Sequence, residues 1–74
     1  MYAIKTSAFF NDKKPDPKPI IGDKQFNYLL DAVEYNNSHT KAIELLGGKI
    51  ERISEDAFYV VFDTHREKHE VVEI

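Results

Sequence analysis

Two histidines and three acidic residues near the C-terminal end are the side chains best suited by type to bind a metal ion. His65 and His69 are four residues apart, and Asp63, Glu67 and Glu70 lie close to them in the chain. A spacing of four brings two imidazoles together on a helix, where they can bind zinc. This segment instead has the pattern of a loop between two strands, and it lacks the glutamate of a helical zinc-protease motif. We interpret it as a solvated polar turn and predict no metal site.

The sequence lacks the other patterns that mark catalysis. Its 74 residues include no cysteine, and we find no Gly-x-Ser-x-Gly motif, phosphate-binding glycine loop or dinucleotide fingerprint. A chain this short also leaves little material for a deep pocket and for the residues that must support it. We therefore predict that the protein is not an enzyme, has no catalytic residues and binds no cofactor.

Composition indicates a small globular domain, which we expect to span residues 1–74. Hydrophobic residues make up 42% and charged residues 31%, with a net charge of -3, so a disordered polyelectrolyte is excluded. No apolar run approaches the length of a membrane span, and the N-terminal segment lacks the pattern of a secretory signal. A cysteine-free composition fits an intracellular protein. We expect a cytoplasmic location.

The hydrophobic pattern predicts one strand, a broken helix and then three more strands. Residues 2–10 alternate between apolar and polar types, as a half-buried strand does. A helix is predicted to begin after Asp23, which can cap its first N–H groups. The residues with helical spacing that should face the core are Phe26, Leu29, Leu30 and Val33. The "NNS" at 36–38 predicts a break, and a shorter second helix should stop at Gly47 and Gly48.

The last three strands are expected to form a meander over residues 49–54, 57–63 and 69–74. If Val60 lies opposite Val72, then Tyr59, Val61 and Val71 share the face that a single helical layer leaves uncovered. The resulting fold is α+β with two layers in the order β-α(α)-β-β-β. Its four-stranded, largely antiparallel sheet is covered on one face by the broken helix.

All three prolines lie in the segment "KKPDPKPII", residues 13–21. Proline lacks an N–H donor and favours extended geometry for itself and its predecessor, so this segment should approach polyproline II. We interpret it as a stiff crossing loop that Ile20 and Ile21 anchor on the core. The alternative is a ligand for an aromatic groove, although the P-x-P-x-P spacing differs from the P-x-x-P frame that such grooves prefer.

Tyrosines that point away from the core indicate a binding surface. Tyr28 and Tyr35 lie almost opposite the predicted core stripe of the helix, with Asp31 alongside. Tyrosine is enriched at binding hot spots, and an uncovered apolar sheet face often marks an interface. We therefore predict a non-enzymatic protein-binding module, an adaptor or inhibitor, that binds through these helix residues together with Tyr59, Val61 and Val71 of the sheet.

The charge distribution suggests what the partner could be. Residues 25–74 carry a net charge of -5, so a partner with a basic groove would be complementary. Small cysteine-free chains of this kind are common among accessory proteins of phages and mobile elements.

Two other hypotheses remain open at this stage. The first is a small RNA- or DNA-binding module that uses the lysine-rich proline loop, with Lys13, Lys14, Lys18 and Lys24 near the aromatic end of the first strand. Scarce arginine and the net negative charge argue against it. The second is a homodimer formed through the uncovered sheet face or through the C-terminal strand as a sheet edge.

Overall fold

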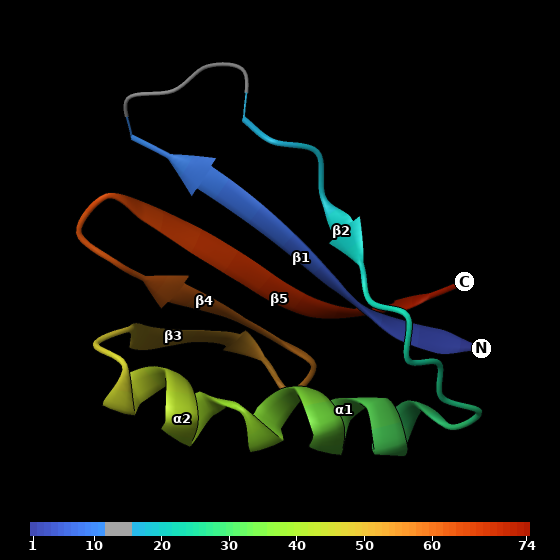
Figure 1. Ribbon diagram of the computed structural model, residues 1–74. Helices are drawn as coiled ribbons and strands as arrows, with labels where there is room; N and C mark the ends of the chain where they lie inside the picture. The colour runs from blue at the N-terminus through green and yellow to red at the C-terminus, as the bar shows by residue number, and fades with distance from the viewer. Residues whose placement is uncertain (12–15) are drawn as a thin grey trace.

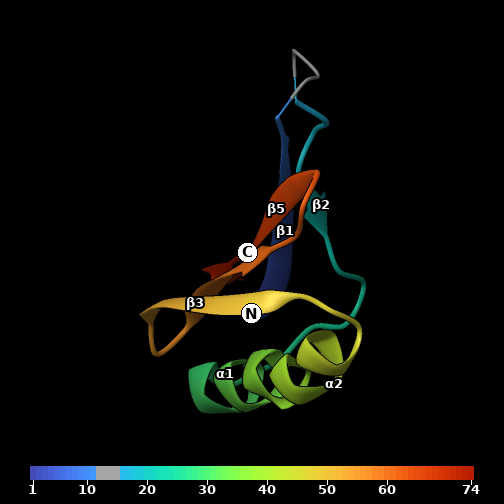
Figure 2. The same cartoon turned by 90° about the vertical axis from the view of Figure 1, so that its left-hand side faces the viewer.

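A twisted antiparallel sheet and a layer of two consecutive helices make up the protein (Figures 1 and 2). The computed structural model describes residues 1–11 and 16–74. The strands have the spatial order β2-β1-β5-β4-β3, which confirms the α+β two-layer fold and adds a short strand, β2. The elements are β1 (Tyr2–Phe10), β2 (Ile20–Ile21), α1 (Leu29–Ser38), α2 (Thr40–Leu45), β3 (Lys49–Ser54), β4 (Ala57–Val61) and β5 (His65–Glu73).

Strand β1 forms where the sequence alternates, and it pairs with β5 along its full length, from Tyr2 opposite Glu73 to Phe10 opposite His65. Ile4 faces the helices in the inner face of the sheet, and the residues on either side of it face outward. Because β5 lies between β1 and β4, the C-terminal strand is central. The expectation that it forms a sheet edge is therefore wrong.

The hairpin of β4 and β5 has a different register from the predicted one. Val60 lies opposite Glu67 rather than Val72. The turn is tight, since the Phe62 N–H donates to the His65 carbonyl at 2.9 Å, and β5 already begins at His65. The shift is five residues, an odd number, so it moves every β5 side chain to the other face. Val71 consequently lies on the inner face opposite Ile4.

The helix begins later than predicted, at Leu29 rather than just after Asp23. The preceding segment is extended along β1: Phe26 and Tyr2 exchange two backbone hydrogen bonds of 2.8 Å each. A backbone that pairs with a strand cannot also be helical, which explains the late start. The predicted core stripe is also wrong, because Leu29 is 47% and Leu30 65% exposed. Ala32 is the apolar residue of α1 that is buried.

The predicted helix break exists, but it falls at His39 between α1 and α2. Asn36 and Asn37 lie inside α1 and use their side chains to bond other elements. Gly47 follows α2 with φ +94°, a conformation that favours glycine, and so ends the helix as expected. The two helices together form one bent helical layer along the sheet (Figure 1).

The proline segment connects β1 to β2, and its first three residues, Lys13, Lys14 and Pro15, lie outside the described residues. The Phe10 N–H donates to the carboxylate of Asp16 at 3.2 Å. Ile20 and Ile21 pair with β1 as strand β2, but they are exposed, so they do not anchor the segment in the core. Within the described ranges, no helix has the length and apolar character needed to span a membrane.

Candidate functional site

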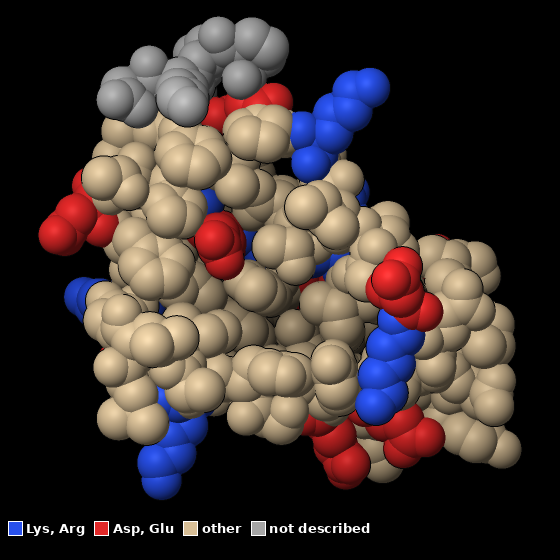
Figure 3. All heavy atoms as spheres, in the orientation of Figure 1, with Lys and Arg blue, Asp and Glu red and all other residues tan. Residues whose placement is uncertain are grey.

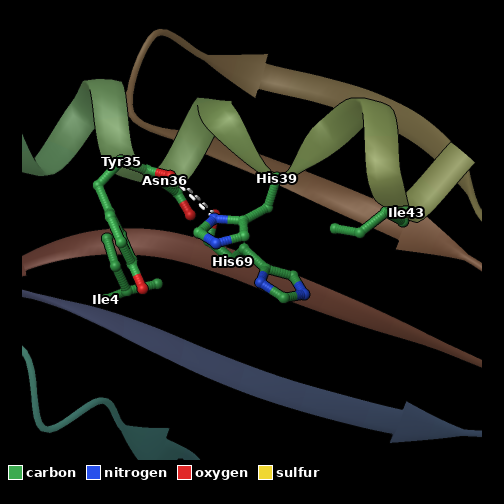
Figure 4. A pocket seen from close by; sticks show the side chains of 6 residues that line it. All are labelled: Ile4, Tyr35, Asn36, His39, Ile43 and His69. Atoms are coloured by element: carbon green, nitrogen blue, oxygen red, sulfur yellow. Dashed lines mark hydrogen bonds between the residues drawn. The ribbon is translucent and has the colours of Figure 1, made fainter.

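A cleft of about 290 Å³ lies between the helical layer and the inner face of the sheet. Figure 4 shows its lining, to which both helices, β1 and β5 contribute side chains. Figure 3 shows the surface hollowed between the helices and the sheet, with few charged groups around the hollow. The lining residues are Ile4, Tyr35, Asn36, His39, Ile43 and His69. Such a cavity is suited to receive one apolar side chain.

Asn36 holds the helical layer at its distance from the sheet. Its side chain is buried, and its amide nitrogen donates to the backbone carbonyls of Asp56 at 3.3 Å and His69 at 3.4 Å. Figure 4 shows the amide directed across the cleft toward β5. Asn37 adds a hydrogen bond to the turn between β3 and β4, since its side-chain amide nitrogen donates to the Glu55 carbonyl at 3.2 Å. These polar contacts hold α1 beside the sheet and so shape the cleft. They come from two asparagines that the sequence pattern had predicted only to break the helix.

Tyr35 and His39 form one wall of the cleft and are held by ring contacts. The Tyr35 ring centroid lies 5.2 Å from that of Phe26 and 4.7 Å from that of His39. The ammonium of Lys24 lies 4.7 Å from the Tyr35 ring, a cation–π contact. Tyr35 was predicted to point away from the core, whereas the structure places it against Phe26 and beside the cleft.

The histidines of β5 lie in a row on the inner face. Glu67 accepts from both: its carboxylate oxygens lie 3.2 Å from Nε2 of His65 and 3.1 Å from Nε2 of His69. His65 also stacks between Phe10 and Phe62, with centroid distances of 4.7 and 4.9 Å. These side chains lie in a packed strand, so the interpretation of this segment as a solvated turn is wrong.

The row does not converge on one point, and no group of three metal-ligating side chains is found over residues 1–11 and 16–74. His69 instead stacks on the buried ring of Phe58, with an interplanar angle of 6°. The arrangement therefore explains packing on the inner face, and we assign it no chemistry.

The sheet residues predicted to bind a partner are divided between the two faces. Tyr59 and Val61 lie on the outer face, which points away from the helices, while Val71 faces inward. The outer face also carries Phe9 and Arg66. The guanidinium carbon of Arg66 lies 4.8 Å from the Tyr59 ring centroid and 6.0 Å from that of Phe9. Sequence reasoning missed this cluster because it used the wrong hairpin register.

The helical layer presents several large apolar side chains to solvent. Tyr28 is 71% exposed, as predicted, and Asp31 is exposed near it on α1. Leu45 and Leu46 are each 82% exposed. Leu30 is also exposed, although the sequence pattern placed it in the core because apolar residues at helical spacing usually face it.

Of the loop lysines considered for nucleic-acid binding, Lys18 and Lys24 are exposed. Lys24 lies against Tyr35 on the helical side of the molecule. Lys13 and Lys14 lie outside the described residues. Comparison with protein-family models, curated proteins and solved structures finds no match to this chain.

Proposed function

We propose that this protein is a small non-enzymatic binding module, an inhibitor or adaptor that acts by covering the surface of another protein. The observation that carries the proposal is its large surface for its size. The accessible surface is 5327 Å² for 8.6 kDa, whereas a folded monomer of this mass typically has about 4,700 Å². The excess of about 600 Å² means that the chain leaves more of its surface exposed than is usual for its mass.

The helical layer supplies the apolar part of the proposed contact. Burial of one exposed leucine or tyrosine side chain in an interface contributes about 1.5–3 kcal/mol. Tyr28 and Leu30 lie at the first turn of α1, and the cleft beside this helix offers a cavity for a side chain of the partner. The partner is proposed to cover Tyr28 and Leu30, which are 71% and 65% exposed at this end of the helical layer.

Charge on the helices indicates the chemistry of the partner. α1 carries Asp31 and Glu34, and α2 carries Glu44 against the single cation Lys41. The helical layer is thus net negative around its exposed apolar residues. An apolar groove rimmed by lysine or arginine is complementary to it, since opposite potentials raise association rates and exclude wrong partners. A cytoplasmic location, expected from the cysteine-free composition, forms part of this proposal.

The test compares two double variants that each remove two large exposed side chains, at opposite ends of the helical layer. Tyr28→Ala/Leu30→Ala removes the proposed contact, and Leu45→Ala/Leu46→Ala is the matched control. A partner captured from native-host lysate after nuclease treatment is purified and titrated calorimetrically against the wild type and both variants. We expect a stoichiometric complex with a negative heat-capacity change on binding. The first variant should weaken it at least about tenfold, the equivalent of about 1.4 kcal/mol.

Three results would contradict the proposal. Equal affinity of the wild type and the Tyr28→Ala/Leu30→Ala variant, with both folded by circular dichroism, would refute the proposed surface. Loss of all captured protein on nuclease treatment would refute protein binding itself. A homodimer that dissociates on Tyr28→Ala/Leu30→Ala would also contradict the proposal, because the apolar residues would then cover one another.

A further inference from the structure

We propose that the outer face of the sheet is a binding site for single-stranded nucleic acid. This face lies opposite the helical layer (Figure 2) and goes beyond the protein-binding surface proposed above. The register of the four longer strands fixes its members. They are Ala3, Lys5, Ser7, Phe9, Lys49, Glu51, Ala57, Tyr59, Val61, Arg66, Lys68, Glu70 and Val72.

An aromatic and cationic band crosses this face over three neighbouring strands. Phe9 on β1 is paired with Arg66 on β5, and Tyr59 lies on the adjoining strand β4. The two rings approach edge to face at 6.5 Å between centroids, and the Arg66 guanidinium lies over both. Ring faces and guanidinium planes are the groups on which unpaired bases stack, at about 1–3 kcal/mol per base.

Charge is segregated onto the same face. Its cations are Lys5, Lys49, Arg66 and Lys68, and its acids are Glu51 and Glu70, so its net charge is +2. The whole chain has a net charge of -3, which leaves -5 for all other residues. Lys68 pairs with Glu70 at 3.6 Å, a half-buried contact that a phosphate could replace. A protein that is acidic overall therefore presents a basic sheet face, which attracts a polyanion.

Small residues lie between the long side chains of this face. Ala3, Ser7 and Ala57 have small side chains and are buried among their longer neighbours. The aromatic rings and the cations project from neighbouring strands, which in a sheet are about 4.8 Å apart. Cations alone would suit an acidic protein segment equally well. The combination of cations with aromatic faces favours a nucleic acid, because bases can stack where acidic side chains cannot.

This inference places a nucleic-acid site on the sheet and not on the proline loop. Lys24 lies over the Tyr35 and Phe26 rings, at 4.7 and 5.7 Å from their centroids. It therefore belongs to the helical side of the molecule. The cations that share one surface with the Phe9 and Tyr59 rings are those of β1, β3 and β5.

Fluorescence anisotropy of a labelled oligothymidylate, titrated with the full chain over a range of salt concentrations, tests the proposal. We expect a dissociation constant in the range of about 10⁻⁴–10⁻⁶ M at physiological salt. Four phosphate contacts to a single strand predict a slope of about -2.8 for log K against log salt concentration. Arg66→Gln/Lys68→Gln should reduce the steepness of this slope by about 1.4. Tyr59→Leu should lower affinity at least about fivefold by loss of one stacked base.

The matched control is Lys18→Gln/Lys41→Gln, which removes the same charge from exposed positions away from the face. It should leave affinity and salt slope unchanged. If Arg66→Gln/Lys68→Gln does not fold by circular dichroism, Lys5→Gln/Lys49→Gln tests the same slope. Absence of saturable binding would overturn the proposal, as would an equal loss in the control. The proposal would also be overturned if polyglutamate bound as tightly as the oligothymidylate and Tyr59→Leu did not change its affinity. That result would indicate an acidic protein partner.

Discussion

Replacement of Asn36 by alanine should destabilise the fold, because this one amide joins the helical layer to two parts of the sheet. The side chain is 2% exposed and donates to the carbonyls of Asp56 and His69. Asp56 also accepts from the Val71 N–H at 3.0 Å, so its carbonyl keeps one partner in the variant. We therefore take the low value of about 1 kcal/mol for each lost hydrogen bond.

The higher helix propensity of alanine returns about 0.6 kcal/mol. The net loss in unfolding free energy is then about 1.4 kcal/mol. For a domain of this size, that loss lowers the melting temperature by about 6–12 °C. Urea denaturation followed by circular dichroism measures it as a lower midpoint at an unchanged m-value.

Asn37→Ala is the matched control, with the same chemical change one residue further along α1. Asn37 makes one exposed hydrogen bond to Glu55, and its Oδ1 is buried without a hydrogen-bond partner in the described part of the chain. Its replacement should change the unfolding free energy by no more than about 0.5 kcal/mol. Equal losses for the two variants, or no loss for Asn36→Ala, would refute the role assigned to the buried amide.

Two further substitutions test the packing around β4. Gly48→Ala should cost about 1–3 kcal/mol, since the added Cβ would lie 2.7 Å from Cγ1 of Val60 and 2.8 Å from Cγ2 of Ile43; a urea midpoint equal to that of the wild type would contradict this. Phe58→Ala should cost about 3–5 kcal/mol, because this ring is fully buried and is one of the two largest side chains in the core. A cooperative thermal transition at the wild-type temperature would show that the core does not depend on it.

The strands could be predicted because their signal is local. The alternation from Tyr2 to Phe10 and the β-branched and aromatic run of β4 indicate strands without knowledge of any partner. The register of β4 and β5 could not be predicted in this way. It depends on the tight turn closed by Phe62 and His65, and matching valine with valine favoured a pairing five residues away.

In the helical layer, the local hydrophobic pattern predicted the wrong core residues. Phe26, Leu29 and Leu30 have the spacing of a core stripe, but Phe26 pairs its backbone with Tyr2 and the leucines are exposed. The residues of α1 that are buried are instead Ala32 and Asn36, and Asn36 donates to the His69 carbonyl of β5. An asparagine in a helix usually indicates a cap or a break, and only the position of the facing carbonyls reveals its structural use.

The candidate surfaces could be predicted in part, because some of their residues follow a local pattern and others are brought together only by strand pairing. Tyr28 and Tyr59 could be found from one helix and one strand, because each points away from the local apolar pattern. The cluster of Phe9, Tyr59 and Arg66 could not be found, since its members come together only through two strand pairings.

Substitutions of Tyr59 can distinguish a structural role of the aromatic residues on the outer face from a role in binding. An aromatic pair such as Phe9 and Tyr59 stabilises a fold by about 0.5–1.5 kcal/mol even if it binds nothing. A purely structural Tyr59 would therefore show its whole effect in the unfolding free energy, and Tyr59→Leu would leave nucleic-acid affinity unchanged. Tyr59→Phe preserves the ring that stacks and removes only the hydroxyl. Wild-type affinity for Tyr59→Phe together with weakened affinity for Tyr59→Leu is thus the pattern that stacking requires and that sheet stability alone does not produce.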